Sequence, residues 1–314
     1  MSTDYIWGNS HPYNAYSDYF KKKYGQGYRK IAVNAGFTCP NRDGSIGTEG
    51  CSYCNNKAFS PSYCDSESSI SEQIVSGMAF NRHKFKNDTF NIAYFQSYTN
   101  TYGNLDKLIQ LYSEAIATPG ISGISVSTRP DCISDELIDF LTNLAHEKYV
   151  CVELGIESCF DETLERINRG HTFAQTVDIV EKLSDKGIVV CGHIIFGLPN
   201  ETSDMLMLEA RVLSNMPIDI LKIHQLQLFK NTTLEEQYLR NPQYFKFFSL
   251  DEYIEILIAF LEKLSPNISI ERLISEVPAK YLVVKPWENT PSEIVLNQIV
   301  ECMRAKNTFQ GRLF

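Results

Sequence analysis

Short apolar runs alternate with longer amphipathic segments along most of the chain. Runs rich in β-branched and aromatic residues predict six strands, over 29–34, 90–96, 123–127, 149–156, 188–196 and 220–228. Apolar residues at helical spacing predict helices over 69–82, 105–118, 135–147, 161–168, 173–186, 202–215 and 250–264. Strands that are apolar on both faces and separated by helices are typical of a parallel sheet covered by helices.

Six strand–helix units of this kind predict an α/β fold, a partial (β/α)6 TIM-like barrel rather than the closed eight-stranded form. We expect an N-terminal extension over 1–28 and a core barrel over 29–235. A C-terminal α/β extension over 236–314 is expected to pack on the core, with one or two strands around a proline turn over 271–286.

Polar residues follow the apolar runs in phase. They are Cys39, Cys51 and Cys54 after the first run, 96–101 after the second, 127–131 after the third, Glu157, Ser158 and Arg169 after the fourth, His193 and 196–201 in and after the fifth, and His224, Gln225 and Gln227 at the sixth. Parallel α/β folds carry their chemistry on the loops that follow the carboxyl ends of the strands. We therefore expect these residues to surround one mouth.

Three cysteines within sixteen residues, Cys39, Cys51 and Cys54, stand in a polar, glycine-rich loop. Zinc normally takes a fourth Cys or His, and the nearest candidate is Cys64, ten residues past Cys54. Three thiolates without an obvious fourth ligand favour a [4Fe–4S] cluster with one iron open to another ligand. Zinc stays open as the alternative.

Composition adds a compartment and one basic feature. The 314 residues contain nine cysteines but no secretory segment and no long apolar stretch, which favours a reducing, cytoplasmic location and no membrane span. The formal net charge of −9 disfavours wholesale wrapping of nucleic acid. A basic island interleaved with tyrosines and a phenylalanine fits either RNA contact or a solvated helix face, and consists of Lys21, Lys22, Lys23, Arg29 and Lys30.

At this point the chain resembles a known family. The resemblance covers roughly residues 10 to 290 and is carried by YFQSYTNTYG (94–103), STRPDCIS (127–134), VELGIESCFDETLERINRGH (152–171), HIIFGLPNET (193–202) and LKIHQLQLFKNTTL (221–234). These motifs are similar to those of the radical S-adenosylmethionine (SAM) superfamily, in particular its YhcC/YtqA (MnmL) type, related to the elongator catalytic subunit. Eleven residues separate the first two cysteines here, where most members have three.

The resemblance implies a cluster and its SAM ligand. Cys39, Cys51 and Cys54 would bind three irons of a [4Fe–4S] cluster, and the fourth iron would bind the methionine end of S-adenosyl-L-methionine. Tyr53 would shield the cluster. The other implied SAM contacts are Gln96, Tyr98 and Asn100 in place of the family's GGE element, Ser127 and Glu157 at the ribose or methionine, Arg169 at the methionine carboxylate, and His193 and Gly197 at the adenine and ribose.

The implied function is radical chemistry on RNA. The elongator-like branch points to tRNA and to conversion of a wobble-uridine carboxymethylaminomethyl group to aminomethyl, with a reductant such as flavodoxin or ferredoxin. A radical enzyme acting on a small molecule or tetrapyrrole is the alternative, and a non-enzymatic iron–sulfur carrier or zinc scaffold is a third. Two interpretations are open for four residues of the C-terminal segment: contact with the substrate, or an ordinary surface or edge position. The four residues are Glu276, Lys280, Lys285 and Trp287.

Overall fold

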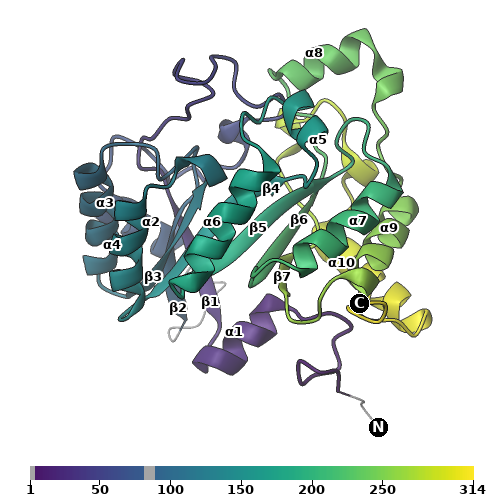
Figure 1. The fold of residues 1–314 in the computed structure, drawn as a ribbon, viewed down its shortest axis with the longest axis horizontal. Coiled ribbons are helices and arrows are strands. Elements are labelled where there is room, and N and C mark those ends of the chain that lie inside the picture. Colours follow the sequence, from purple (N-terminus) through teal and green to yellow (C-terminus); the bar gives the residue numbers. More distant parts are fainter. Residues whose placement is uncertain (1–3, 81–88) are drawn as a thin grey trace.

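The computed structural model describes residues 4–80 and 89–314. Seven strands form one parallel sheet in chain order. They are β1 (Tyr28–Val33), β2 (Phe90–Phe95), β3 (Ile121–Thr128), β4 (Tyr149–Glu157), β5 (Val189–Phe196), β6 (Ile220–Gln225) and β7 (Ser269–Arg272). The sheet curls into a half-barrel, and this confirms the predicted α/β, partial TIM-barrel fold (Figure 1).

Helices cover the outer face of the sheet (Figure 1). The helices are α1 (Tyr16–Tyr24), α2 (Ile70–Phe80), α3 (Leu105–Ala117), α4 (Asp135–Ala145), α5 (Asp161–Arg166), α6 (Phe173–Asp185), α7 (Ser203–Ser214), α8 (Thr233–Arg240), α9 (Leu250–Lys263) and α10 (Ser292–Ala305). In the described part of the chain, no helix has the length and apolar character needed to traverse a membrane.

The strands and helices agree with the sequence pattern to within two or three residues at most ends. The predicted helix over 69–82 extends past the described residues, which stop at 80 before the gap. Of the one or two strands expected over 271–286, the structure has β7, which overlaps only the start of this range. The rest of the range forms no strand and holds a 3-10 turn at Ala279–Tyr281, which corrects that expectation. Strand β7 pairs in parallel with β6 and so extends the sheet.

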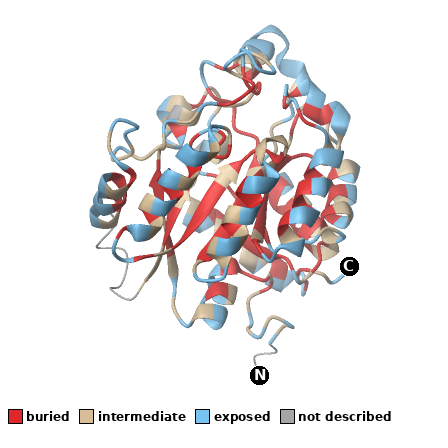
Figure 2. Cartoon of the chain, turned by 60° about the vertical axis from the view of Figure 1, so that its left-hand side comes forward, coloured by how far each residue is buried: buried red, intermediate tan, exposed pale blue. Residues whose placement is uncertain are grey.

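The core lies between the sheet and its helices (Figure 2). Val152, Leu154 and Ile156 of β4 are fully buried, as expected for a strand covered on both faces. Each buried aliphatic side chain contributes about 1.5–3 kcal/mol through the hydrophobic effect. Capping boxes fix the starts of two outer helices, at Thr172 before α6 and at Ser249 before α9.

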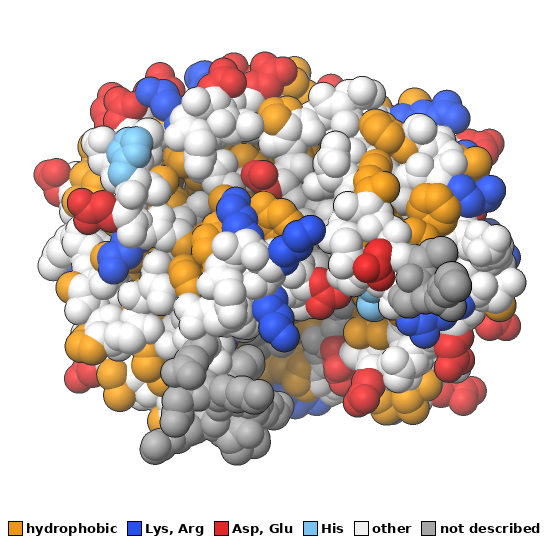
Figure 3. Space-filling view, turned by 90° about the horizontal axis from the view of Figure 1, so that it is seen from below, with side chains coloured by type: hydrophobic (Ala, Val, Ile, Leu, Met, Phe, Trp, Pro, Cys, Tyr) orange, Lys and Arg blue, Asp and Glu red, His pale blue; other side chains and the backbone are white. Residues whose placement is uncertain are grey.

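Helix α1 covers the opposite end of the barrel from the cysteine loop. Its Tyr16 and Phe20 are buried against residues at the amino-terminal ends of the strands, and the Tyr16 hydroxyl bonds that of Tyr149 at 2.7 Å. At this lower end of the molecule, seen directly in Figure 3, lysines and arginines gather near the centre. The aromatic face of α1 therefore closes the barrel.

The basic island does not form one surface, so of its two interpretations a solvated helix face fits only the three lysines of α1. Lys21, Lys22 and Lys23 are exposed on α1, whereas Arg29 is buried. The Lys30 ammonium points into the barrel and contacts carboxylates there. Arg29 and Lys30 are neighbours in the sequence, but successive side chains of a strand point to opposite faces, so β1 separates them.

Candidate active site

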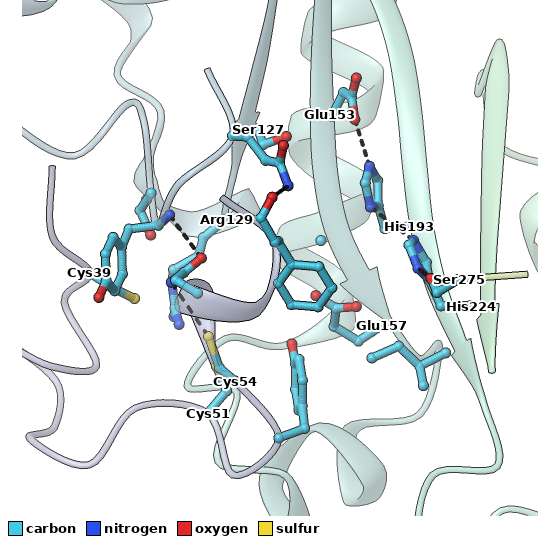
Figure 4. A pocket seen from close by; sticks show the side chains of 18 of the residues that line it. Cys39, Cys51, Cys54, Ser127, Arg129, Glu153, Glu157, His193, His224 and Ser275 are labelled. Atoms are coloured by element: carbon cyan, nitrogen blue, oxygen red, sulfur yellow. Dashed lines mark hydrogen bonds and ion pairs between the residues drawn. The ribbon is translucent and has the colours of Figure 1, made fainter. Parts of the chain in front are cut away.

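A cavity of about 230 Å³ opens at the carboxyl ends of the strands (Figure 4). Every one of the strand-end groups expected from the sequence contributes to its lining. The predicted residues that line it are Cys39, Cys51, Tyr53, Cys54, Gln96, Tyr98, Ser127, Glu157, Arg169, His193, His224, Gln225 and Gln227. The in-phase polar residues thus meet at one mouth, as their positions after successive strands predicted.

The cysteine loop is fastened to the segment after α5. The Asn41 amide donates to the backbone carbonyls of Asn168 at 2.7 Å and Arg169 at 3.1 Å. The backbone N–H of Ser52 donates to the Ile167 carbonyl at 2.9 Å. Residues more than a hundred positions apart are therefore held together, and the loop that carries the cysteines is fixed against the segment that carries Arg169.

The cysteine sulfurs lie among nitrogen donors. Sγ of Cys51 accepts from Arg169 Nη1 at 3.5 Å and from the Asn41 amide at 3.6 Å. Sγ of Cys54 accepts from the Asn56 amide at 3.7 Å. Burial, with the neighbouring Cys51 thiol, raises the pKa of Cys54 to about 11, and nearby guanidinium groups oppose the rise. Bound metal removes such a proton, because the thiolate is the ligand form.

The donor set fits a cluster better than a single ion. Within the described residues, the His, Cys, Asp and Glu ligand atoms that lie within 4.8 Å of one another belong to Glu153, Cys191 and His193, not to the three loop cysteines. Ligands of one zinc ion crowd around it, whereas the cysteines of a [4Fe–4S] cluster each bind a different iron. The three thiols do not all lie within 4.8 Å of one another, which fits ligands of separate irons better than ligands of one ion.

Cys64, the candidate for a fourth thiolate that the sequence suggested, does not line the cavity. Its thiol donates to the Ala32 carbonyl at 3.2 Å, and burial raises its pKa to about 11. It is therefore a protonated, hydrogen-bonded thiol beside β1, which leaves three thiols at the cavity.

Arg169 is held by an unusual stretch of β4. The β4–β5 register shifts between Gly155 and Glu157, and Glu157 has a φ of 65°. Such bulges and left-handed residues re-aim side chains at functional sites. Arg169 Nη2 donates to the Gly155 carbonyl at 2.7 Å and lies 3.4 Å from a Glu157 carboxylate oxygen. The bend thus presents a carboxylate and a guanidinium together.

The Arg169 guanidinium keeps capacity for another acceptor. Its Nε is buried and has no hydrogen-bond partner among the described residues. Burial lowers the pKa of Arg169, but Tyr53, Cys51 and Glu157 outweigh this effect and hold the pKa well above its usual value. A permanent buried cation with an unused donor, beside the cysteine loop, fits a ligand that carries a carboxylate.

The remaining predicted SAM contacts differ in position. Tyr98 lies at the mouth with a φ of 62° and 38% exposure, and the Ser127 hydroxyl donates to the Tyr94 hydroxyl at 3.0 Å. Asn100 does not line the cavity: it is fully buried, and its amide donates to the carbonyls of Phe95 and Ser127. Gly197, with a φ of 90°, lines a smaller adjoining pocket.

A buried carboxylate organises the floor of the cavity, and the sequence analysis did not identify it. Glu153 is fully buried and accepts from Lys30 at 2.7 Å and Lys222 at 2.6 Å. The hydroxyls of Ser125 and Tyr94 also donate to it, at 2.6 and 3.0 Å. Burial alone would raise the pKa of Glu153, but the two lysines hold it well below its usual value. Lys30, Glu153 and Lys222 each stand inside an apolar strand, and such charged residues could have indicated a buried ion-pair network.

A row of hydrogen bonds leads from Glu153 towards the mouth (Figure 4). His193 Nε2 lies 2.8 Å from Glu153, and His193 Nδ1 lies 3.3 Å from His224 Nε2. His224 Nδ1 pairs in turn with the Ser275 hydroxyl. Burial lowers the pKa of both histidines. Neutral imidazoles satisfy the whole row, with each His donating through Nε2 and accepting through Nδ1.

The chain matches known sequences over most of its length. Residues 38–211 match the Radical SAM superfamily, and residues 218–305 match the Radical SAM C-terminal domain. It is 32% identical to the uncharacterized protein YtqA of Bacillus subtilis, over 96% of this chain and 92% of that protein. It is 28% identical to the tRNA uridine(34) acetyltransferase of Methanocaldococcus infernus, over 55% of this chain and 32% of that enzyme.

The solved structure of Methanocaldococcus infernus Elp3 lacking its N-terminus has a similar fold, with a TM-score of 0.67 at 17% identity. The similarity covers 91% of this chain and 64% of that one. The chain therefore shares the fold across nearly its whole length and spans somewhat under two thirds of the archaeal protein.

Proposed function

Because this chain belongs to the radical SAM superfamily, we propose that it acts on tRNA and converts a carboxymethylaminomethyl group on the wobble uridine to aminomethyl. The chain is a radical SAM enzyme, and its cofactors are a [4Fe–4S] cluster and S-adenosyl-L-methionine. The tRNA substrate and the reaction are the proposal.

Cys39, Cys51 and Cys54 would ligate three irons. No fourth cysteine is among the described residues that line the cavity, so one iron would stay open for SAM. When bound, the cluster would supply the electron for reductive cleavage of SAM, which would provide the radical that abstracts hydrogen from a substrate carbon. A one-electron carrier protein such as flavodoxin or ferredoxin would reduce the cluster.

Arg169 would bind the SAM carboxylate, since it is a permanent cation 3.5 Å from the Cys51 sulfur. Glu157, held at a positive φ, would accept from the ribose hydroxyls, and the Ser127 oxygen would accept nearby. His193 would contact the nucleoside as a neutral group, because the lysine-paired Glu153 fixes its Nε2. Tyr53, half-buried in the cavity lining, would help to exclude water from the site.

The observation that carries the tRNA proposal is the similarity to the archaeal tRNA uridine(34) acetyltransferase, which spans 55% of this chain. An open mouth above the cavity suits a nucleotide rotated out of its stack, which chemistry on a base requires. The net charge of −9 favours the small-molecule alternative, and the experiment distinguishes the two.

The test compares modified nucleosides in tRNA from a strain lacking this gene and from its parent, by mass spectrometry. We expect carboxymethylaminomethyl-uridine to accumulate and aminomethyl-uridine derivatives to fall, with recovery on expression of the intact protein but not of Cys51→Ala. Identical nucleoside profiles in all strains would remove tRNA as the substrate and favour a metabolite.

A further inference from the structure

Arginines are the cations that line the cavity mouth, and they differ in their partners. They are Arg42, Arg129, Arg169 and Arg272. Arg42 donates to the Cys54 carbonyl at 3.0 Å. Arg129 contacts the Asp131 carboxylate at 2.8 Å, and Arg169 contacts the Glu157 carboxylate at 3.4 Å. Arg272 forms no ion pair or hydrogen bond with any described residue and is exposed. It is a cation that the protein itself does not neutralise.

A bulge in β7 turns this side chain towards the cavity. Leu221 pairs with Ile270 and Lys222 pairs with Arg272, so the register passes over Glu271. In a bulge, two successive residues of one strand face one residue of its partner. Glu271 accordingly reaches Lys30 inside the barrel at 2.6 Å, and the next residue, Arg272, also lines the cavity. Regular alternation would have sent one of the two outwards.

The charged groups near Arg272 are already paired: the preceding residue, Glu271, contacts Lys30 at 2.6 Å and Lys222 at 3.6 Å. Burial, and then the charge of Arg272, hold the pKa of neighbouring His224 well below its usual value, so this imidazole is neutral. Ser275 offers a neutral hydroxyl beside it. Two carboxylates are among the described residues that line this cavity, Glu157 and Glu153. Lys30 and Lys222 already neutralise Glu153. The region is therefore positive and polar.

Arg272 and Arg169 belong to different sides of one cavity. Arg169 is fixed to the cysteine loop through Cys51. Arg272 belongs to the wall built by β5, β6 and β7, where the row from Glu153 to Ser275 lies apart from the cysteines (Figure 4). A molecule bound beside the cysteines would have Arg169 as its cation, and a second molecule facing it would have Arg272.

We propose that Arg272 is the anchor of an oxyanion subsite for the substrate. The inference rests on the proposed function, in which the side chain to be shortened ends in a carboxylate. The planar guanidinium binds two oxygens at once, which orients a carboxylate or a phosphate and not merely attracts it. The carboxylate of the uridine side chain is the source that we favour, and an RNA phosphate offers the same chemistry.

The experiment measures RNA affinity of the anaerobically reconstituted holoenzyme at one stated salt concentration. The probes are two anticodon stem-loop RNAs that differ only at the wobble position, carboxymethylaminomethyl-uridine in one and uridine in the other. The proteins are wild type, Arg272→Gln, Arg272→Lys and, as a matched control, Arg240→Gln on the exposed surface of α8. Iron content and SAM affinity are measured in parallel and should be equal in all four.

We expect Arg272→Gln to weaken binding of the carboxylate-bearing RNA about tenfold or more, the scale of a lost hydrogen bond to a charged group. Arg272→Lys should recover part of the loss, and Arg240→Gln should equal wild type. A loss confined to the modified RNA identifies the carboxylate as the oxyanion. An equal loss with both RNAs supports the subsite and identifies a phosphate instead.

Unchanged affinity of Arg272→Gln for both RNAs, with wild type active on the modified RNA, would overturn the subsite and leave the proposed function intact. Failure of wild type to form 5′-deoxyadenosine above its RNA-free rate would instead overturn the proposed function, and the inference with it. The RNA affinity of Arg272→Gln therefore tests the subsite, and 5′-deoxyadenosine formation by wild type tests the proposed function.

Discussion

Arg169 approaches Gly155 so closely that a side chain at position 155 would displace its guanidinium. Its Nη2 donates to the Gly155 carbonyl at 2.7 Å, and an ideal Cβ on Gly155 would lie 2.4 Å from the same nitrogen. The same Cβ would lie 2.5 Å from the Glu157 carboxylate. Contacts this short force the guanidinium and the carboxylate to move, and neither can shift without losing the arrangement that the β4 bulge creates.

We therefore predict that Gly155→Ala weakens SAM binding while retaining the cluster. Loss of a charged partner in a partly buried site costs about 2–5 kcal/mol, and displacement of Arg169 should approach the lower part of that range. Calorimetric titration of the reconstituted protein with SAM measures it. Gly27→Ala is the matched control, because nothing lies within 4 Å of its ideal Cβ. Equal SAM affinity in both variants would contradict the role given to Arg169.

Cluster content should separate the cysteines sharply. Replacing Cys39, Cys51 or Cys54 by Ala should abolish the iron–sulfur absorbance, since each supplies a thiolate that nothing else at the cavity replaces. Cys64→Ala should retain it, because that thiol donates to the Ala32 carbonyl outside the cavity. Iron and sulfide analysis after anaerobic reconstitution gives the result. Loss of the cluster in Cys64→Ala would mean four protein ligands and no open iron.

The barrel floor should be a major source of stability. Glu153→Gln removes a fully buried carboxylate from two buried lysines and leaves their charges poorly compensated. Breaking a buried ion pair on one side costs about 3–5 kcal/mol. Urea denaturation midpoints compare this variant with Glu236→Gln, whose surface pair with Arg240 should contribute under about 1 kcal/mol. A similarly small effect for both variants would show that the network adds no stability.

A buried carboxyl on the turn after β5 predicts a pH dependence of stability. Burial raises the pKa of Glu201 to about 7, against hydrogen bonds such as that donated by Ser158 at 2.5 Å. Because the folded pKa is raised, the stabilisation is complete below the unfolded pKa of about 4.3 and is lost as pH rises towards 7. That loss is on the order of 3 kcal/mol.

Glu201→Gln should remove this loss, so the variant should gain stability relative to wild type between pH 5 and pH 8. Denaturation midpoints at the two pH values measure the difference. Glu162→Gln, at an 83% exposed side chain on α5, is the control and should follow wild type. Parallel pH profiles for wild type and Glu201→Gln would exclude Glu201 as the titrating group.

The sequence predicted the sheet and the mouth well, because both depend on local patterns. Apolar runs such as that of β4 and the polar residues directly after them follow from periods of two and 3.6 residues. The cysteines could be assigned together because they stand in one loop.

What the sequence did not predict depends on distant partners or on register. Lys30 reads as a surface cation beside Lys23, but its partners Glu153 and Glu271 lie 123 and 241 positions away. Arg272 lines the cavity because of a bulge between β6 and β7, and a shift of one residue leaves no mark in a four-residue strand.

In the proposed function, reduction of the cluster would start SAM-dependent chemistry on a modified wobble uridine. Reduced holoenzyme, SAM and tRNA bearing carboxymethylaminomethyl-uridine should form 5′-deoxyadenosine above the tRNA-free rate, with a matching loss of the modified nucleoside. Arg169→Ala, which retains its three cluster cysteines, should do so far more slowly. Equal 5′-deoxyadenosine formation with and without tRNA, and an untouched nucleoside, would contradict the proposed function.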